Sequence, residues 1–474
     1  MLTRVGNISK RAWIVALSLG CVSWLVAACH ASPPPPERPD GPNVLFVVIE
    51  TLRKDHLELY GYDKSTAPNL TSFAKNALIF DNAVVQANWT IPSVATMFTS
   101  MYPASHKFIV QHDQASVLNP RIQTLAEVLR TSGYKTGAYQ TNMFLTPESG
   151  IAQGIDDYRQ KDAVSAGLVV AAAIRWLGAN GKDPFFLYLH FYDPHAPYKP
   201  PAGLDKRFRE EAEDNRPESF FSDLYRHIFL YEDELLIRDL NRYRAAYDAS
   251  IWNMDYELRK LLQYLDDQGL TDETLIVFIA DHGEEFGDHG GLDHGYNLYE
   301  YMVGVPLIVR FPEGRSGRIE TRVGAIDLAP TILDYLGIEP PPTFQGRSFV
   351  PLVENPGGEH KTLEFSQGNG IGNVKEHRSG LDLEQQCVYD GRFKLIRSSP
   401  SGTVELYDLL EDPREQRDLA PAKPGIVRKL VADLDAFLKD AEANSLDPEE
   451  KILLDDEDLE KLKSLGYVGG QESE

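Results

Sequence analysis

The chain has 474 residues, of which 42% are hydrophobic, and carries a formal net charge of −24. That length and hydrophobic content can supply one large domain and a smaller one. The acidic balance argues against nucleic acid as a partner, because phosphate backbones bind basic surfaces. Cysteines occur at positions 21, 29 and 387, so the mature chain has no disulfide framework.

The first 28 residues have the features of an export signal. Arg4, Lys10 and Arg11 precede an apolar stretch that is short for a membrane span and ends in small residues. The end of this stretch, Val26-Ala27-Ala28-Cys29, resembles a bacterial lipobox. The resemblance implies a lipoprotein signal peptide over residues 1–28 and a lipid-modified Cys29. We therefore expect an exported protein anchored to a bacterial membrane, facing the periplasm or the exterior, with an ordinary secretory signal as the alternative.

Residues 29–41 contain four consecutive prolines and predict a stiff, extended tether. From residue 43 to about 340, strand-like and helix-like segments then alternate. Strands are predicted at 44–49, 136–139, 185–192 and 275–280, and helices near 69–77, 90–100, 122–131 and 243–265. The alternation predicts an α/β fold with a doubly wound, mainly parallel sheet over residues 42–350. Residues 203–240 are rich in charge and predict a surface insertion.

The pattern changes after residue 350. Short runs at 386–389, 393–397 and 404–407 are separated by turn residues and predict a small antiparallel sheet. A helix is expected over 425–444. Residues 351–445 therefore predict a C-terminal α+β subdomain, followed by an acidic tail over 446–474.

Two of the predicted strands end abruptly in residues that bind metals. Glu50 follows the strand at 44–49, and Asp281 and His282 follow the strand at 275–280. Ligands of open α/β sheets gather beyond the carboxyl ends of the strands, so these side chains are expected to meet. The alternative is that each acid only ends a strand or caps a helix.

A candidate nucleophile lies in the segment Asn88-Trp89-Thr90-Ile91-Pro92. Proline favours the first turn of a helix, which places Thr90 at a helix start, where an anion is stabilised. A threonine hydroxyl is barely ionised at neutral pH, so it needs a metal to attack phosphorus or sulfur. The alternative is that Thr90 is only a helix cap.

Several ordered motifs resemble the sulfatase branch of the alkaline phosphatase superfamily and together cover most of residues 42–420. They are Glu50-Thr51-Leu52-Arg53-Lys54-Asp55-His56, Thr66-Ala67-Pro68-Asn69-Leu70, Asp193-Pro194-His195-Ala196-Pro197-Tyr198, Ala280-Asp281-His282-Gly283-Glu284-Glu285, Asp293-His294-Gly295, and Asp327-Leu328-Ala329-Pro330-Thr331. The resemblance implies an alkaline phosphatase-like fold and a metal-dependent hydrolase of phosphoric or sulfuric esters.

The chain departs from the sulfatase pattern at positions that handle sulfate. Sulfatases carry a cysteine or serine that becomes formylglycine, with an arginine four positions on, whereas this chain has Thr90 and Val94. The paired leading aspartates are replaced by Glu50 and Thr51. A lysine-bearing motif is replaced by Gln140-Thr141-Asn142.

The remaining set, Glu50, Thr90, Asp281 and His282, resembles the metal site of lipoteichoic acid synthases and phosphoethanolamine transferases. The resemblance implies a divalent metal, either zinc or manganese, and calcium fits less well because of the histidine. His195 and His294 are candidates to bind the substrate, protonate the leaving group or hold a second metal. Asn142 is a candidate anion contact, and His289 and Asp255 are either functional or structural.

Three functions are compatible with these residues. The preferred one is a hydrolase or transferase that cleaves phosphate mono- or diesters through Thr90. The second is a sulfatase acting without formylglycine, and the third is an inactive binding protein on the same fold. The sequence does not identify the ester substrate.

Overall fold

A computed structural model describes residues 41–111, 114–209, 237–361, 363–369 and 384–453 of the chain. These residues belong to one compact unit, Pro39–Glu474. The expected signal peptide, Cys29, nearly all of the tether and the last 21 residues of the expected tail lie outside the described residues, as does most of the 203–240 insertion. Those expectations therefore stay predictions.

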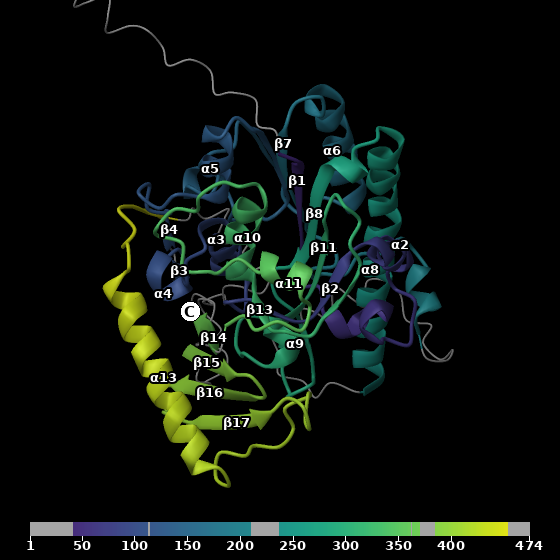
Figure 1. Cartoon of the computed structure of the whole chain (residues 1–474). Coiled ribbons are helices and arrows are strands. Elements are labelled where there is room, and N and C mark those ends of the chain that lie inside the picture. Colours follow the sequence, from purple (N-terminus) through teal and green to yellow (C-terminus); the bar gives the residue numbers. More distant parts are fainter. Residues whose placement is uncertain (1–40, 112–113, 210–236, 362, 370–383, 454–474) are drawn as a thin grey trace, which may run out of the picture. The chain divides into compact units, whose positions relative to one another are not determined.

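The centre of the unit is a nine-stranded sheet (Figure 1). Its strands lie in the order β12 (Gly317–Ile319), β2 (Leu78–Val84), β11 (Gly304–Arg310), β8 (Thr274–Ala280), β1 (Asn43–Ile49), β7 (Phe185–Phe191), β5 (Lys135–Gln140) and β6 (Asp157–Gln160), and β13 (Val323–Gly324) also pairs with β2. β11 runs antiparallel to both of its neighbours, and the other pairs are parallel. The predicted mainly parallel sheet is confirmed.

The three central strands β1, β7 and β8 are buried along their whole length. Their aliphatic and aromatic side chains face helices on both sides, which explains why these strands are continuous apolar runs in the sequence. Ile49 at the end of β1 pairs with Phe191 of β7 and with Ala280 of β8. This register brings the residues that follow the three strands to the same edge of the sheet.

Helices cover the sheet in two groups (Figure 1). One group is α2 (Pro68–Phe73), α6 (Ala166–Asn180) and α8 (Ile237–Asp267), and the other is α3 (Thr90–Thr99), α4 (Pro103–His106), α5 (Leu125–Thr131) and α10 (Leu328–Tyr335). The short helices α9 (Glu300–Val303) and α11 (Val350–Glu354) lie in connections. The helix predicted at 69–77 is shorter than expected, because a 3₁₀ turn at Ala74–Asn76 leads directly into β2.

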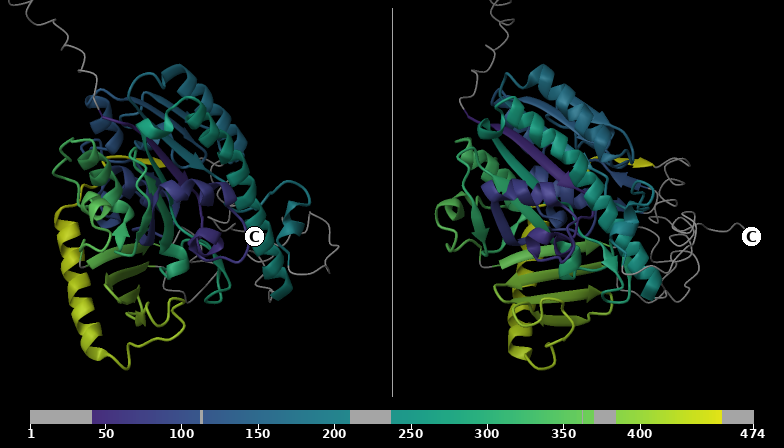
Figure 2. Two further views of the ribbon diagram at one scale, coloured as in Figure 1. Left: turned by 45° about the vertical axis from the view of Figure 1, so that its right-hand side comes forward. Right: turned by 90° about the vertical axis from the view of Figure 1, so that its right-hand side faces the viewer.

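The C-terminal part forms the expected small antiparallel sheet (Figure 2). It contains β14 (Leu363–Asn369), β15 (Glu384–Asp390), β16 (Phe393–Ser399) and β17 (Val404–Asp408). One face packs against α13 (Pro424–Ala443), whose Leu430 and Leu434 share a core with Val388, Leu395 and Leu406. β14 was not predicted from the sequence.

Part of the segment predicted as an acidic tail is a strand. β18 (Lys451–Leu453) pairs with β4 (Gln114–Ser116), which also pairs with β3 (Val110–Gln111). Among the described residues, no helix combines the length and apolar character that crossing a membrane requires.

Candidate active site

The side chains that follow β1 and β8 meet, as the sequence predicts. Glu50, Asp281 and His282 are all completely buried. The backbone amide of Thr51 donates a hydrogen bond to Oδ1 of Asp281 at 3.1 Å, which joins the ends of the two strands directly. A second amide, that of His282, donates to the same oxygen at 2.9 Å. Residues 230 positions apart therefore form one cluster.

Thr90 lies at the start of α3, with its hydroxyl directed into this cluster. Its Oγ1 donates to Oε1 of Glu50 at 3.0 Å and lies 3.3 Å from Nε2 of His282. The N-cap position of α3 is Trp89, and it makes no side-chain cap hydrogen bond. The Thr90 hydroxyl therefore contacts the acidic cluster and not the helix backbone, which distinguishes it from a simple cap.

The imidazole of His282 is held with one nitrogen toward Thr90. Its Nδ1 lies 2.9 Å from the carbonyl oxygen of Gly283. A carbonyl can only accept, so Nδ1 carries the hydrogen and Nε2 presents its lone pair to the cluster. Burial lowers the pKa of His282 well below its ordinary value, which keeps the ring neutral. A neutral imidazole fixed in this tautomer is the form that binds a metal.

Asn142 lies just beyond the end of β5 and contacts Glu50. Its Nδ2 donates to Oε1 of Glu50 at 2.6 Å, and its Oδ1 accepts from the amide of Phe144 at 2.9 Å. Asn142 is 4% exposed. It therefore holds the Glu50 carboxylate in place, and its predicted role as an anion contact stays a prediction.

The carboxylates of Glu50 and Asp281 are close together, and few neighbouring groups balance their negative charge. Burial, and then the neighbouring Asp281, raise the pKa of Glu50 well above its ordinary value. Burial also raises the pKa of Asp281. Among the described residues, Oε2 of Glu50 and Oδ2 of Asp281 have no hydrogen-bond partner. A divalent cation between them would remove this penalty, so the oxygen and nitrogen donors present here fit a metal.

A second cluster surrounds His294. Its Nδ1 lies 3.1 Å from Oε1 of Glu284 and 2.7 Å from Oδ1 of Asp293. Burial alone would lower the pKa of His294, but the two carboxylates overcome this and raise it well above its ordinary value. The His294 ring lies 4.4 Å from that of His282 and 5.0 Å from that of His195, measured between ring centroids.

His195 has the opposite electrostatic character to His294. Burial and the nearby His294 lower the pKa of His195 to about 3. One imidazole of the pair is therefore charged at neutral pH and the other is neutral. Groups whose environments separate their pKa values in this way are suited to different roles in proton transfer and anion binding. Both predicted histidines, His195 and His294, lie beside the cluster of Glu50, Thr90, Asp281 and His282, which we call the Thr90 cluster.

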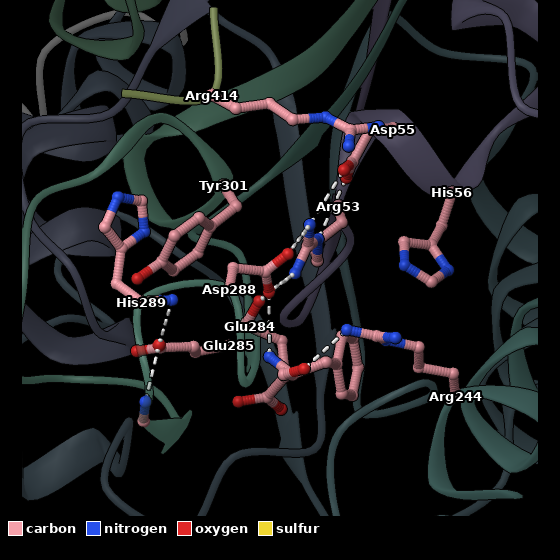
Figure 3. A network of polar contacts seen from close by, with 12 residues as sticks. Arg53, Asp55, His56, Arg244, Glu284, Glu285, Asp288, His289, Tyr301 and Arg414 are labelled. Atoms are coloured by element: carbon pink, nitrogen blue, oxygen red, sulfur yellow. Dashed lines mark hydrogen bonds and ion pairs between the residues drawn. The ribbon is translucent and has the colours of Figure 1, made fainter. Parts of the chain in front are cut away.

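Arg53 connects the exit of β1 to the segment that carries Glu284 (Figure 3). Its Nη1 donates to the carbonyl oxygen of Glu284 at 2.8 Å and to Oδ2 of Asp288 at 2.7 Å. Its Nε and Nη2 donate to Asp55 at 2.9 and 2.7 Å. The guanidinium is 4% exposed and holds the hairpin of β9 (Glu285–Phe286) and β10 (Leu292–Asp293) against the first strand.

The backbone directly after Glu50 is strained. Thr51 has a φ of 55°, a left-handed conformation that is unfavourable for a β-branched residue. Tyr247 of α8 stabilises this turn, because its hydroxyl donates to the carbonyl of Thr51 at 2.7 Å and accepts from the amide of Arg53 at 2.8 Å. Strain of this kind concentrates at functional sites, where the surrounding structure holds it in place.

His289 and Asp255 have structural contacts. Nε2 of His289 lies 2.9 Å from the carbonyl of Glu415, and its ring stacks on a tyrosine. Asp255 accepts from the amides of Asn69 and Leu70 at 3.0 and 2.8 Å and so caps α2.

His190 of β7 was not among the predicted site residues, yet it faces the cluster. Its Nε2 lies 3.9 Å from Oδ2 of Asp281, and its Nδ1 lies 2.9 Å from the hydroxyl of Tyr188. Burial lowers the pKa of His190 to about 4. The signal for it was present in the sequence, since it is the one histidine within the apolar run at 185–192.

The described part of the chain also has a surface cavity of about 450 Å³ between α6, strand β5 and the edge strand β6. Its lining includes Gln140, Thr141, Arg159, Lys161 and Arg175. None of the residues of the Thr90 cluster lines it. The chemistry of the buried cluster is therefore separate from this cavity.

Comparisons with known proteins agree with the geometry. A family profile described as "Sulfatase" matches residues 42–338, and one described as "N-sulphoglucosamine sulphohydrolase, C-terminal" matches residues 287–443. The chain is 25% identical to an arylsulfatase of Clostridium perfringens, over 80% of this chain and 90% of that protein. It is 26% identical to the multifunctional alkaline phosphatase superfamily protein PehA of Trinickia caryophylli, over 81% of this chain and 93% of that protein.

A solved structure shares the same fold. The phosphonate monoester hydrolase of Agrobacterium radiobacter superposes with a TM-score of 0.66 at 24% identity, covering 85% of this chain and 96% of that one. Members of these families bind a divalent metal, and the acidic and histidine groups described above could hold one. The chain belongs to the sulfatase family of the alkaline phosphatase superfamily and is a hydrolase of sulfuric or phosphoric esters.

Proposed function

We propose that this protein cleaves phosphate mono- or diesters, with Thr90 as the nucleophile and with Glu50, Thr90, Asp281 and His282 as the ligands of a divalent metal. The observation that carries the proposal is the position of the Thr90 hydroxyl. Its Oγ1 lies 3.0 Å from Glu50 and 3.3 Å from His282, at the start of a buried helix. The hydroxyl is therefore held where a metal would activate it.

A metal bound to these ligands would lower the pKa of the Thr90 hydroxyl and neutralise charge on the ester oxygens. Thr90 Oγ1 then forms a bond to phosphorus as its proton passes to Oε1 of Glu50, which accepts its hydrogen bond, and the bond to the leaving oxygen breaks. His294 is charged and lies beside His282, so it is placed to bind the ester and to give a proton to the leaving oxygen. Water next attacks phosphorus, which releases inorganic or monoester phosphate and restores the hydroxyl.

His195 and Asn142 complete the proposed substrate contacts. His195 is neutral and packs beside His294, so it can accept a hydrogen bond from the attacking water, whose proton restores the Thr90 hydroxyl. Asn142 holds Glu50 through its amide group.

The proposed metal ligands are two carboxylates, a hydroxyl and an imidazole. This mixed donor set favours zinc or manganese over calcium.

A sulfatase acting without formylglycine is the second candidate. It is supported by the similarity to the arylsulfatase of Clostridium perfringens. The same attack by Thr90 at sulfur would give a sulfated threonine. Against it, Val94 stands where sulfatases have an arginine, as the sequence comparison above indicates.

The test compares wild type with Thr90→Ala and Thr90→Ser on phosphate monoesters, phosphate diesters and sulfate esters. We expect Thr90→Ala to lose about 10³-fold or more of kcat, and Thr90→Ser to keep measurable turnover, because it retains a hydroxyl. The matched control is Thr99→Ala, which removes another buried hydroxyl of α3 that donates to the carbonyl of Ala95 and accepts from the amide of Met101. Tandem mass spectrometry after rapid quenching should locate phosphate on Thr90.

Two results would redirect the proposal. Turnover of sulfate esters with a sulfated Thr90 would establish the second candidate. Unchanged kcat in Thr90→Ala, with no modified Thr90 on any substrate, would reject Thr90 as the nucleophile for both.

We also propose that the mature protein is anchored to a membrane through a lipid on Cys29. The lipobox-like sequence before Cys29 supports this. Detergent phase partitioning of cell extracts should place the wild-type protein in the detergent phase and Cys29→Ser in the aqueous phase. Cys21→Ser is the matched control and should partition like wild type; identical partitioning of all three in the aqueous phase would favour an ordinary secretory signal.

A further inference from the structure

Three fully buried polar atoms lie in side chains at the ends of the central strands near Thr90. They are Oε2 of Glu50, Nε2 of His190 and Oδ2 of Asp281, and none has a hydrogen-bond partner among the described residues. One ligand atom from each of the three residues lies within 4.8 Å of the other two. A buried polar group without a partner costs about 1–3 kcal/mol, and more when it is charged. Three such atoms aimed at one point need a common explanation.

We propose that His190 is a further ligand of the metal, in addition to the four residues named above. The inference rests on the proposed metal site and adds a second imidazole to it. Nε2 of His190 and Nε2 of His282 lie 3.9 and 3.5 Å from the same oxygen, Oδ2 of Asp281. Ligands bound at about 2.0–2.2 Å lie no more than about 4.4 Å apart, so the distance of each imidazole from Asp281 is short enough for that pair to share an ion.

A purely structural role for His190 does not explain the unpaired atoms described above. A separation of 3.9 Å from Asp281 is too long for a hydrogen bond, so the ring is not simply paired with that carboxylate. Its only hydrogen-bonded ring nitrogen is Nδ1, which lies 2.9 Å from the hydroxyl of Tyr188. A core histidine would leave Nε2 unsatisfied next to two unsatisfied carboxylate oxygens.

The sheet positions His190 rigidly for this role. Tyr188 and His190 are two residues apart on β7 and therefore project on the same face. Val48 of β1 pairs with His190, one residue before the Ile49 that precedes Glu50. In the tautomer in which Nδ1–H donates to the Tyr188 hydroxyl, Nε2 keeps its lone pair for a metal. Metal-binding histidines are usually oriented through their other nitrogen in this way.

His190 as an added ligand restricts which metals the site can bind. Two imidazoles, two carboxylates and a hydroxyl form a donor set for zinc, manganese or a similar transition ion. Calcium and magnesium prefer oxygen ligands, and a site with two imidazoles selects against them. A site that includes His190 should therefore bind zinc or manganese tightly and should also prefer them to calcium and magnesium.

The test measures metal binding to the full-length protein, independently of turnover. Isothermal titration with Zn²⁺, Mn²⁺ and Ca²⁺ is compared for wild type, His190→Gln and Tyr188→Phe. We expect His190→Gln to weaken Zn²⁺ binding by more than 10-fold and Tyr188→Phe by about 10-fold. The matched control is His106→Gln, which removes a completely buried histidine that bonds to Thr96 in α3 and should leave Zn²⁺ affinity unchanged.

Pulsed EPR of the Mn²⁺-loaded protein counts coordinated imidazoles directly. We expect two in wild type and one in His190→Gln. If His190→Gln does not fold, the number of coordinated imidazoles in wild type and the Zn²⁺ affinity of Tyr188→Phe still test whether His190 is a ligand. One imidazole in wild type, or unchanged Zn²⁺ affinity in His190→Gln, would overturn the inference.

The two proposals fail in different ways. Loss of Zn²⁺ affinity in His190→Gln, in a protein that turns over no phosphate ester, would support His190 as a ligand while rejecting the proposed function. Metal-dependent turnover through Thr90, with only one coordinated imidazole, would support the function and reject His190.

Discussion

At single residues, the cost of a substitution depends on whether the charge it removes is buried. Arg53 is 4% exposed and bonds to Asp55, Asp288 and the Glu284 carbonyl. Arg53→Met would remove a buried cation, but Asp288 keeps the amide of Phe286 as a donor and Asp55 is 57% exposed. We therefore expect a loss of about 1–3 kcal/mol in the free energy of unfolding, measured by urea denaturation. Turnover should also fall, because the segment carrying Glu284 loses its connection to β1.

The matched control for Arg53→Met is Arg318→Met. Arg318 forms an ion pair with Asp81 at the surface, where its side chain is 45% exposed. Pairs of this kind contribute about 0–1 kcal/mol. Equal losses for the two substitutions would contradict the role assigned to Arg53.

Cys387 gives a second prediction at this scale. It is a buried thiol in β15, and burial raises its pKa to about 11. The reactive form is the thiolate, so the folded protein should resist iodoacetamide at pH 8 and react at an ordinary rate only in urea. In the double variant Cys21→Ser/Cys29→Ser, Cys387 is the only thiol, and rapid labelling of the folded protein would contradict its burial.

The sequence predicted some site residues and missed others for a physical reason. Glu50, Asp281 and His282 end strongly apolar strands, and the change from apolar to polar marks them. His190 lies inside such a strand, one residue before its end. From sequence, a histidine there looks the same whether it supports the core or binds a metal. The distinction needs the unpaired oxygens that face it, which only the assembled sheet brings together.

At the scale of elements, a buried lysine connects the small sheet to the large one. Nζ of Lys394 in β16 lies 2.8 Å from Oε1 of Glu415 and 3.2 Å from Oε1 of Glu300, which begins α9. The hydroxyl of Tyr389 donates to the same Glu300 oxygen at 2.7 Å. α9 leads directly into β11 of the central sheet. Lys394 therefore holds together three segments of the chain.

We expect Lys394→Met to lower the free energy of unfolding by about 3–5 kcal/mol, because two buried carboxylates lose their cation. Lys429→Met is the matched control, since Lys429 pairs with Asp390 and Asp433 where its side chain is 56% exposed. Urea denaturation measures both. A loss no larger than the control's would mean that the ion pairs of Lys394 do not contribute to holding the two sheets together.

Strand β14 shows where pattern analysis failed at this scale. Its sequence, Leu-Glu-Phe-Ser-Gln-Gly-Asn, becomes polar after Phe365 and contains a glycine. Its place is fixed by contacts far along the chain: the Ser366 hydroxyl donates to the carbonyl of Val85, and the Gln367 amide donates to that of Gln86. Strand propensity is a weak predictor where long-range pairing of this kind determines whether a segment forms a strand.

Across the folded unit, the proposed metal ligands lie in α3 and β7 and directly after β1 and β8. Glu50 and His282 are 232 positions apart in the chain, so an unfolded chain would not hold the donors together. A metal that binds only the folded state stabilises it by RT ln(1 + [L]/Kd), which is about 4 kcal/mol at a free metal concentration 1,000 times Kd. Metal content and folding stability are therefore expected to be linked.

Removing the metal should lower the melting temperature, measured by calorimetry before and after treatment with a chelator, and Zn²⁺ or Mn²⁺ should restore it. Asp281→Asn should abolish this response, because Asp281 is the carboxylate that both imidazoles face. Arg318→Met should keep the full response, since Arg318 lies at the surface, where it pairs with Asp81. A melting temperature that does not change when bound metal is shown to be lost would mean that the strand ends are held by their own hydrogen bonds, chiefly Thr51 to Asp281, and that the ion contributes to chemistry alone.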